Sequence, residues 1–335
     1  MTNLSAKRIV LSCLLLPAAI GLSQQPERTP NTSATFQPVL DTMFSTSTTK
    51  VQYNYVMTGR VRLVLFWVGA DDVGGGYIRR SYGTSDPDVR ITQVLFGSDP
   101  AKAPRKINHW GAGTEAITAE HSTTFMGFMT SAKTNSVAEA EGELKEKEEL
   151  GQYPFQAIVS VVDKDRALSR SISLSSDRNF NLHEYDAARR LVAERLKTSG
   201  TLRELTGIKR KCAECRGFLQ ATDVLIDRAL SGVKGPQSVC YIHNARNYTL
   251  TLDEHSKVKR KIIHLTRKNG TKLEKEYRDL IRAHFSILNH ESGERSTFEL
   301  LLGTVGELRG VPVQIVHQPN WWFEAELNLE VISRG

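Results

Sequence analysis

The chain has 335 residues, of which 40% are hydrophobic and 24% are charged, and its formal net charge is +7. This length can bury the core of one large or two ordinary domains. The positive charge is spread along the chain, and its densest patch, at residues 257–261, has no aromatic platform or nucleic-acid-binding motif beside it. We therefore predict a globular protein without a nucleic-acid partner and interpret the patch as a solvated strand end.

Residues 1–23 have the three parts of a secretory signal peptide. Lys7 and Arg8 form the charged region, residues 9–22 form an apolar core too short to span a bilayer, and Ser23 suits the cleavage position. No later segment reaches ~18 uninterrupted apolar residues, so we expect the mature protein not to be transmembrane. We place it in a periplasm or outside the cell, where disulfides are allowed.

Residues 24–50 are rich in Gln, Pro, Ser and Thr, which predicts a flexible lead-in to a single globular domain over residues 51–335. The domain opens with residues 51–68, where nearly every odd position is apolar, as is typical of a strand with one buried face. We expect one long strand, with a bend or bulge at Gly59, that ends at GADDVGGG, residues 69–76, where the three glycines make a turn or loop.

Helical patterns occur at three places. A very charged helix is predicted over residues 136–150, on the surface or as a connector, and it suggests a sub-boundary near residues 136–152. A second helix is capped by Asn181 and ends at Gly200, and a third covers residues 215–230.

Short apolar runs predict further strands. They lie at residues 77–80, 92–96, 155–162, 171–174, 239–243, 248–252, 262–267, 298–302 and 321–331. Residues 277–288 fit a helix or a strand. Asn269-Gly270 is the strongest hairpin signal in the chain and favours a type I′ turn.

Three cysteines remain after the leader, Cys212, Cys215 and Cys240. Together with His243 they have the paired spacing of a Cys3His zinc site, the one cofactor that we consider. Cys212 and Cys215 also have the spacing of a redox pair ahead of a helix, whose N-terminus lowers a thiol pKa. A third interpretation, one structural disulfide and one buried thiol, is the one we favour for an oxidising compartment.

Asp71 and Asp72 are paired carboxylates beside the glycines 74–76. Such a pair can bind a cation or act as acid and base, but we favour turn residues whose side chains bond nearby backbone groups. The glycines match neither a dinucleotide fingerprint nor a phosphate-binding loop, and the histidines stand in no catalytic motif. We therefore predict no catalytic residue.

Trp321 and Trp322 are neighbours in the predicted last strand, which places one indole on each face of the sheet. Both cannot enter the same core, so one is a candidate contact for a ligand or a partner. Trp67 and Trp110 complete the set of candidate ligand contacts.

Three stretches are the most distinctive in the chain: FWVGADDVGGGYIRR, LFGSDPAKAPRKINHWGAGTE and LNHESGERSTFELLLGTVGELRGVPVQIVHQPNWWFEAELNL. Together they resemble a family of exported bacterial proteins with no assigned activity, and the likeness extends over most of residues 51–331. The closing pattern, residues 312–315 and a final alternating strand, is also similar to periplasmic half-open-barrel carriers of lipids or lipoproteins. These resemblances imply export, a curved sheet and no particular reaction.

We predict an α+β protein in which a large, curved, mainly antiparallel sheet, or half-barrel, is covered on one side by two or three helices. The leading functional prediction is a non-enzymatic secreted or periplasmic binding protein, or an envelope-associated protein, with an apolar groove. Its candidate partners are a lipid or other apolar ligand and an envelope protein. The alternatives are a metal- or thiol-active protein that uses the cysteine group, and a hydrolase with a dispersed site.

Overall fold

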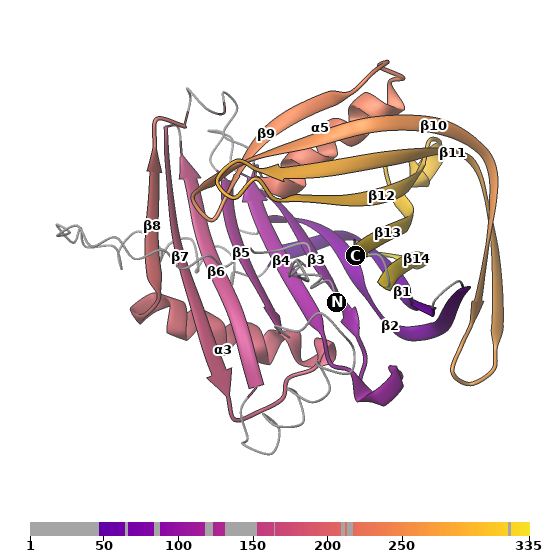
Figure 1. Cartoon of the computed structure of the whole chain (residues 1–335), viewed down its shortest axis with the longest axis horizontal. Helices are drawn as coiled ribbons and strands as arrows, with labels where there is room; N and C mark the ends of the chain where they lie inside the picture. Colours follow the sequence, from indigo (N-terminus) through magenta and orange to yellow (C-terminus); the bar gives the residue numbers. More distant parts are fainter. Residues whose placement is uncertain are drawn as a thin grey trace, which may run out of the picture.

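A single antiparallel sheet of 14 strands frames the protein, in the order β8-β7-β6-β5-β4-β3-β2-β1-β14-β13-β12-β11-β10-β9 (Figure 1). The structure, a computed structural model, describes residues 47–63, 66–83, 88–117, 123–130, 153–163, 165–208, 212, 217–320 and 323–335. The predicted signal peptide and the predicted helix over residues 136–150 lie outside these ranges. The first and last strands pair with each other at the centre of the sheet.

The strands of the first half of the chain are β1 (Ser47–Leu63), β2 (Phe66–Gly83), β3 (Arg90–Ser98), β4 (Trp110–Ile117), β5 (Thr123–Thr130), β6 (Tyr153–Asp163), β7 (Arg166–Ser176) and β8 (Thr201–Thr206). Those of the second half are β9 (Gln237–His243), β10 (Arg246–Thr266), β11 (Lys272–Asn289), β12 (Arg295–Gly303), β13 (Pro312–Asn320) and β14 (Phe323–Arg334). The helices are α3 (Tyr185–Thr198) and α5 (Phe218–Leu230), with short 3-10 helices η1 (Pro104–Lys106), η2 (Leu182–Glu184) and η3 (Gly306–Leu308).

Residues 51–68 do not form the single long strand that we predicted, because they are divided between β1 and β2. Val61 pairs with Val68 and Leu63 with Phe66, so the chain reverses direction inside this segment. The apolar pattern continues through the reversal because paired residues of antiparallel strands share a face. Periodicity alone therefore could not reveal the hairpin.

The GADDVGGG segment lies within β2 and is not the turn that we predicted. Residues 71–73 form a bulge there, because all three stand opposite Thr58 of β1. The glycines 74–76 then let β2 approach its neighbours closely: a Cβ on Gly75 would lie 2.3 Å from the carbonyl oxygen of Tyr55. Glycine is required at this point by close packing between strands.

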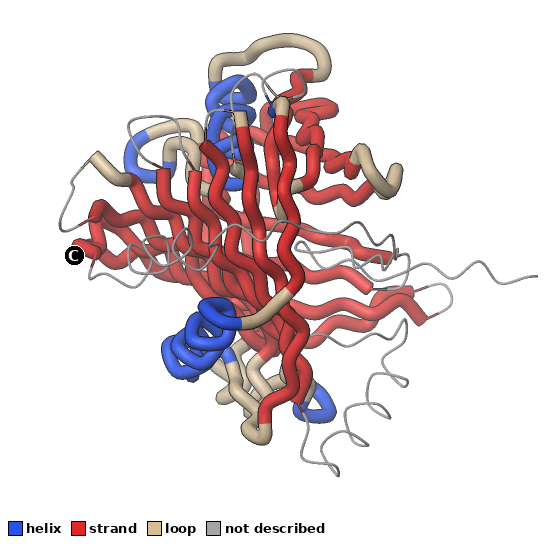
Figure 2. The backbone as a smooth tube through the Cα atoms, turned by 90° about the vertical axis from the view of Figure 1, so that its left-hand side faces the viewer, coloured by secondary structure: helices blue, strands red, loops and turns tan. Residues whose placement is uncertain are grey.

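The two α-helices cover opposite faces of the sheet, not one face as we predicted. Adjacent residues of β4 show this, since Thr114 lies 3.4 Å from the hydroxyl of Tyr185 in α3, whereas Glu115 accepts the N–H of Leu219 in α5. Successive strand residues point to opposite faces. The sheet curves around α5, and α3 lies on the outer face (Figures 1 and 2). An amphipathic stripe shows that a helix packs on a sheet but not on which face.

Each helix builds its own core. The outer core joins α3 to β3, β4, β6 and β7, and its fully buried members include Leu196 and Val159. The inner core joins α5 to β9, β10, β11 and β12, with Leu225 and Phe285 fully buried. The predicted cap at Asn181 is confirmed, since its side chain and that of Glu184 form a capping box at η2, immediately before α3.

A third core lies where the β10–β11 hairpin curls over the inner face of the central strands. We call residues 258–280 of this hairpin the hairpin arm; Figure 1 shows it bending past β14 toward β2. Tyr277 of the arm packs in the same cluster as Tyr55 and Leu329. Gly270 supplies a positive φ at the tip but Asn269 does not, so the predicted hairpin is present without the type I′ turn.

The sheet remains open, because β8 and β9 have one neighbour each within the part of the chain that the structure describes. Its two margins are nevertheless joined. A disulfide links Cys212, just beyond β8, to Cys240 of β9, and Ser169 of β7 donates a hydrogen bond of 2.9 Å to Asn244 of the β9–β10 turn. A small buried cluster that includes Ile208 packs between the same margins.

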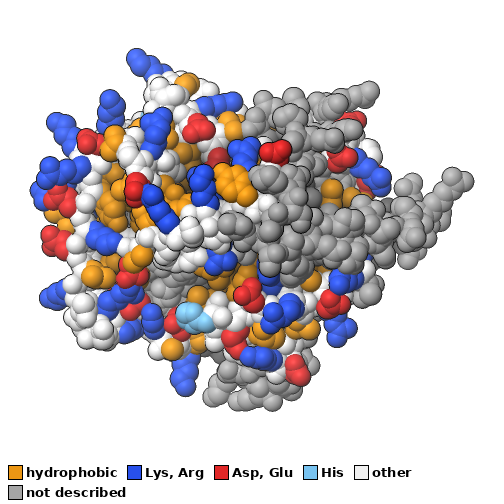
Figure 3. All heavy atoms as spheres, turned by 180° about the vertical axis from the view of Figure 1, so that it is seen from behind, with side chains coloured by type: hydrophobic (Ala, Val, Ile, Leu, Met, Phe, Trp, Pro, Cys, Tyr) orange, Lys and Arg blue, Asp and Glu red, His pale blue; other side chains and the backbone are white. Residues whose placement is uncertain are grey.

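None of the helices described is both long and apolar enough to cross a membrane. Seen from behind, the surface carries Lys and Arg side chains with Asp and Glu among them (Figure 3). This distribution agrees with a small positive charge that is spread along the chain.

Candidate functional site

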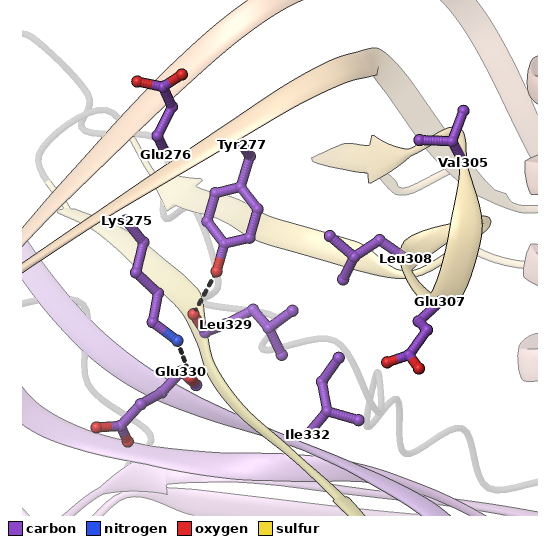
Figure 4. Close-up of a pocket in the computed structure, with 9 residues that line it drawn as sticks. All are labelled: Lys275, Glu276, Tyr277, Val305, Glu307, Leu308, Leu329, Glu330 and Ile332. Atoms are coloured by element: carbon purple, nitrogen blue, oxygen red, sulfur yellow. Dashed lines mark hydrogen bonds between the residues drawn. The ribbon is translucent and has the colours of Figure 1, made fainter.

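An open pocket of about 510 Å³ lies between β11, η3 and β14 (Figure 4). Its volume falls in the range of roughly 300–1,000 Å³ that is usual for small-molecule sites. Nine residues line it: Lys275, Glu276, Tyr277, Val305, Glu307, Leu308, Leu329, Glu330 and Ile332.

The pocket exists because the sheet separates at this point. Pairing between β13 and β14 ends at Gln314 and Asn328, whereas β14 continues to Arg334 alongside β1. The segment that joins β12 to β13 contains η3 and lies on one side of this unpaired part of β14. The hairpin arm lies on another side, and the space between the η3 segment, the hairpin arm and β14 is the pocket.

The floor of the pocket is apolar. Tyr277 and Leu329 are buried, Leu308 and Ile332 are half-buried, and Val305 at the outer end is 60% exposed. Figure 4 shows the side chains of Tyr277, Leu308, Leu329 and Ile332 around the central space. The Tyr277 hydroxyl donates a hydrogen bond of 2.8 Å to the carbonyl of Leu329, and burial raises the pKa of Tyr277 to about 12. This phenol is therefore neutral at physiological pH.

Lys275 is the cation of the pocket. Its ammonium donates a hydrogen bond to the backbone carbonyl of Glu330, and burial lowers the pKa of Lys275. It forms no ion pair with any residue that the structure describes. A positive charge without a counter-ion thus lies at one end of an apolar pocket.

The carboxylates of the pocket all have cationic partners. Glu276 points away from the central space and pairs with Arg260 and Arg278 (Figure 4). The other two are engaged in the same way, Glu307 with Arg334 and Glu330 with Arg267.

Asp71 and Asp72 hold the tip of the hairpin arm against β2. Asp71 accepts the backbone N–H of Thr266 at 2.9 Å. Asp72 lies 3.0 Å from a guanidinium nitrogen of Arg267 and 3.1 Å from the ammonium of Lys102. Burial alone would raise the pKa of Asp72, but the N–H of Lys268 and the two cations outweigh it and lower the pKa. Both side chains accept backbone N–H groups, as expected of turn residues, yet these groups belong to a hairpin remote in sequence.

The cysteine group is divided by the disulfide. Cys212 and Cys240 are bonded to each other, and Cys215 lies outside the described residues. His243 is buried against the ring of Tyr248, and burial together with the charge of Arg246 lowers the pKa of His243 to about 4. The disulfide agrees with the interpretation that we favoured. The zinc and redox alternatives remain predictions, and in the disulfide form two of the four candidate ligands are not thiolates.

Trp110 is the one candidate tryptophan whose side chain the structure describes. It is 3% exposed in the outer core and donates a hydrogen bond of 2.9 Å to the carbonyl of Phe180. It lies on the opposite face of the sheet from α5 and does not line the pocket. The side chains of Trp67, Trp321 and Trp322 lie outside the described residues, so their proposed ligand contacts stay predictions.

A hydroxyl and an imidazole meet at Thr249 and His290, whose oxygen and Nε2 are 2.7 Å apart. This is the first requirement of a hydrolase site. His290 is exposed, and no described carboxylate forms an ion pair with it. The pair is outside the pocket described above, and the hydrolase with a dispersed site stays a prediction.

The pocket residues were missed because they come from three segments remote in sequence. Lys275 and Tyr277 alternate with Glu276 and Arg278, a pattern that indicates one inward face of a strand. We left residues 277–288 undecided between helix and strand, and the structure shows that they lie in the strand β11. No local signal places it beside Leu329.

Comparison with known proteins gives the chain no family. No protein-family model matches it, and no curated protein is significantly similar to it. Among solved structures, one similar chain is a beta-barrel-like protein of a domain of unknown function, DUF1849, from Brucella abortus, with 7% sequence identity and a TM-score of 0.42. The match covers 86% of this chain and 98% of that chain. Function therefore has to be inferred from the residues of this chain.

Proposed function

We propose that the protein is a non-enzymatic binding protein that holds a small apolar ligand in the pocket between β11, η3 and β14. The observation that carries this proposal is the separation of β13 from β14, which leaves an accessible space with buried Tyr277 and Leu329 at its floor. Val305 lines the pocket and is 60% exposed, so a ligand can reach the pocket there without unfolding a strand. Export, which we predict from the signal peptide at residues 1–23, would place the protein in a compartment that contains envelope lipids.

The apolar lining supplies the binding free energy in this proposal. Each methylene group that leaves water contributes about 0.8 kcal/mol, which is about a fourfold gain in affinity. Affinity should therefore rise with alkyl chain length until the pocket is full and then stop rising. A surface that binds hydrocarbon without a defined pocket would show no such limit.

Two adjacent residues of β14 provide a matched pair of variants. Ile332 lines the pocket, whereas Val331 is 49% exposed and does not line it. We expect the mature protein to bind the neutral apolar probe N-phenyl-1-naphthylamine, and Ile332→Asn to weaken this binding at least about tenfold, since it removes apolar contact. Val331→Asn should leave the affinity unchanged.

Fluorescence titration measures the affinity, and thermal unfolding checks that both variants fold. Native mass spectrometry of the purified protein would show any ligand that it retains. Equal effects of the two substitutions, or no probe binding by the unmodified protein, would refute the proposed pocket.

A further inference from the structure

We propose that the pocket selects single-chain anionic amphiphiles, with a carboxylate or phosphate head group held by Lys275 and the alkyl chain directed toward Val305. This inference rests on the proposed function and names the chemical class of its ligand.

The position of Lys275 suits a head-group contact. Lys275 and Tyr277 are two residues apart on β11, so both point to the same face. The Lys275 side chain reaches β14, where it donates to the carbonyl of Glu330. An ammonium has three N–H donors, so this bond leaves two for a ligand.

The charges around Lys275 favour an anion. Glu330 directs its carboxylate to Arg267, not to Lys275, and the other two pocket carboxylates also have arginine partners. Among the described residues that line the pocket, every carboxylate thus has a cationic partner, and none presents an unpaired negative charge to the ligand. A cationic head group would meet the like charge of Lys275 and would be disfavoured.

The apolar residues define the direction of the chain. Figure 4 shows Lys275 at one end of the pocket and Leu308 and Val305 at the other, with Tyr277 between them. A head group at Lys275 thus places the alkyl chain along Tyr277 and Leu329 toward the exposed end. Polar and apolar parts of the pocket have the separation that an amphiphile requires.

The test compares four ten-carbon ligands, decanoate, decyl phosphate, decan-1-ol and decyltrimethylammonium, by isothermal titration of the full mature protein at pH 8 below their micelle concentrations. We expect at least one anion to bind about tenfold to 100-fold more tightly than decan-1-ol, as hydrogen bonds to charged groups imply. The cation should bind most weakly. The better of the two anions identifies a fatty-acid or a phosphate head.

Three variants isolate the role of Lys275. Lys275→Met should abolish the preference for the anion and retain the affinity for decan-1-ol, whereas Lys275→Arg should keep the preference. Lys272→Met removes the same charge from an exposed position of the same strand and should change nothing.

The possible failures are distinguishable. If neither the four ligands nor N-phenyl-1-naphthylamine binds, the proposed function itself is wrong; if only that neutral probe binds, the inference about single-chain amphiphiles is overturned. If all four bind equally and Lys275→Met has no effect, the pocket binds hydrocarbon but the inference about its head group is overturned. Retained decan-1-ol binding by Lys275→Met shows that this variant folds.

Discussion

Glu115 of β4 links the inner face of the curved sheet to the N-terminus of α5. It is 1% exposed, and its two carboxylate oxygens each accept a backbone N–H, from Leu219 and Gln220, at 3.0 Å. Burial raises the pKa of Glu115 to about 7, although these two hydrogen bonds lower it. A side chain 104 residues away thus caps the helix, in a way that no capping motif of the sequence indicates.

Stability should depend on the protonation of Glu115. Its folded pKa lies above its ordinary value of 4.5, so the folded state binds the proton more tightly and this contribution is lost as pH rises from 4.5 to about 7. The loss amounts to about 3 kcal/mol at most. His243 acts in the opposite sense, because its lowered pKa removes stability as pH falls from 6.5 to about 4.

Glu115→Gln should therefore change the pH profile of the free energy of unfolding. Relative to the unmodified protein, the variant should gain about 2–3 kcal/mol between pH 5 and pH 8, because Gln does not ionise. Urea unfolding at four pH values measures the difference. Glu194→Gln, at an exposed position of α3, is the control and should show no such trend. A constant difference between Glu115→Gln and the unmodified protein would contradict the assignment.

At the level of secondary-structure elements, the sequence predicted the features that leave a periodic hydrophobic pattern or a capping motif. Alternation located most strands, and the Asn181 cap located the start of η2 and α3. The reversal between β1 and β2 was missed because the apolar pattern runs through it. The bulge at residues 71–73 was taken for a turn because glycine occurs in both and aspartate is a common turn residue.

The hairpin arm should depend on Asp72 for its attachment. Asp72→Asn tolerates the positive φ of 53° at this position but removes the charge that pairs with Arg267 and Lys102. We expect a loss of about 2 kcal/mol, as is usual for hydrogen bonds to a buried charged group. Hydrogen exchange should become faster at residues 262–275 and remain unchanged in the outer core.

Acid should reproduce this effect, since the pKa of Asp72 is lowered from its ordinary value of 3.8. The contribution of Asp72 is present above pH 3.8 and is lost as pH falls below it. Asp253→Asn is the matched control, because Asp253 accepts a hydrogen bond from Ser286 at an exposed site of the same hairpin. Faster exchange at residues 262–275 in that variant would count against a specific role of Asp72.

The disulfide should contribute to stability by linking the margins of the open sheet. Cys212 and Cys240 are 28 residues apart, and closing such a loop in the unfolded chain is worth about 3–4 kcal/mol. Cys240→Ser should lose about this amount in denaturant unfolding, and reductant should have no further effect on the variant. Cys215→Ser should keep the stability of the unmodified protein. A similar loss in both variants would mean that Cys215 takes part in the pairing.

At the scale of the whole molecule, the decisive contacts join residues that are distant in sequence. β1 pairs with β14, so Tyr55 stands opposite Leu329 at the centre of the sheet. Composition and alternation predicted a large curved antiparallel sheet, which is confirmed. They could not predict the strand order, the helix on each face or the pocket, because each of these depends on which strands meet and not on how each strand is patterned.

Because of this topology, a bound ligand should slow hydrogen exchange in a specific set of segments. The pocket is lined by residues of β11, the η3 segment and β14, three parts of the chain that no single element connects. Decanoate at 100 times its dissociation constant should stabilise the protein by about 2.7 kcal/mol. Hydrogen exchange should slow at residues 272–278, 303–309 and 329–333, because the ligand links all three segments in the folded state.

The outer core is the internal reference for this experiment. α3 and the side chains that pack against it lie on the opposite face of the sheet from the pocket. The local opening of α3 should therefore not respond to a ligand in the pocket. Ile332→Asn should lose the protection at all three segments together, since one ligand contacts them all. Protection confined to the hairpin arm would place the ligand elsewhere on that arm, and uniform protection that includes α3 would indicate a global effect without a local site.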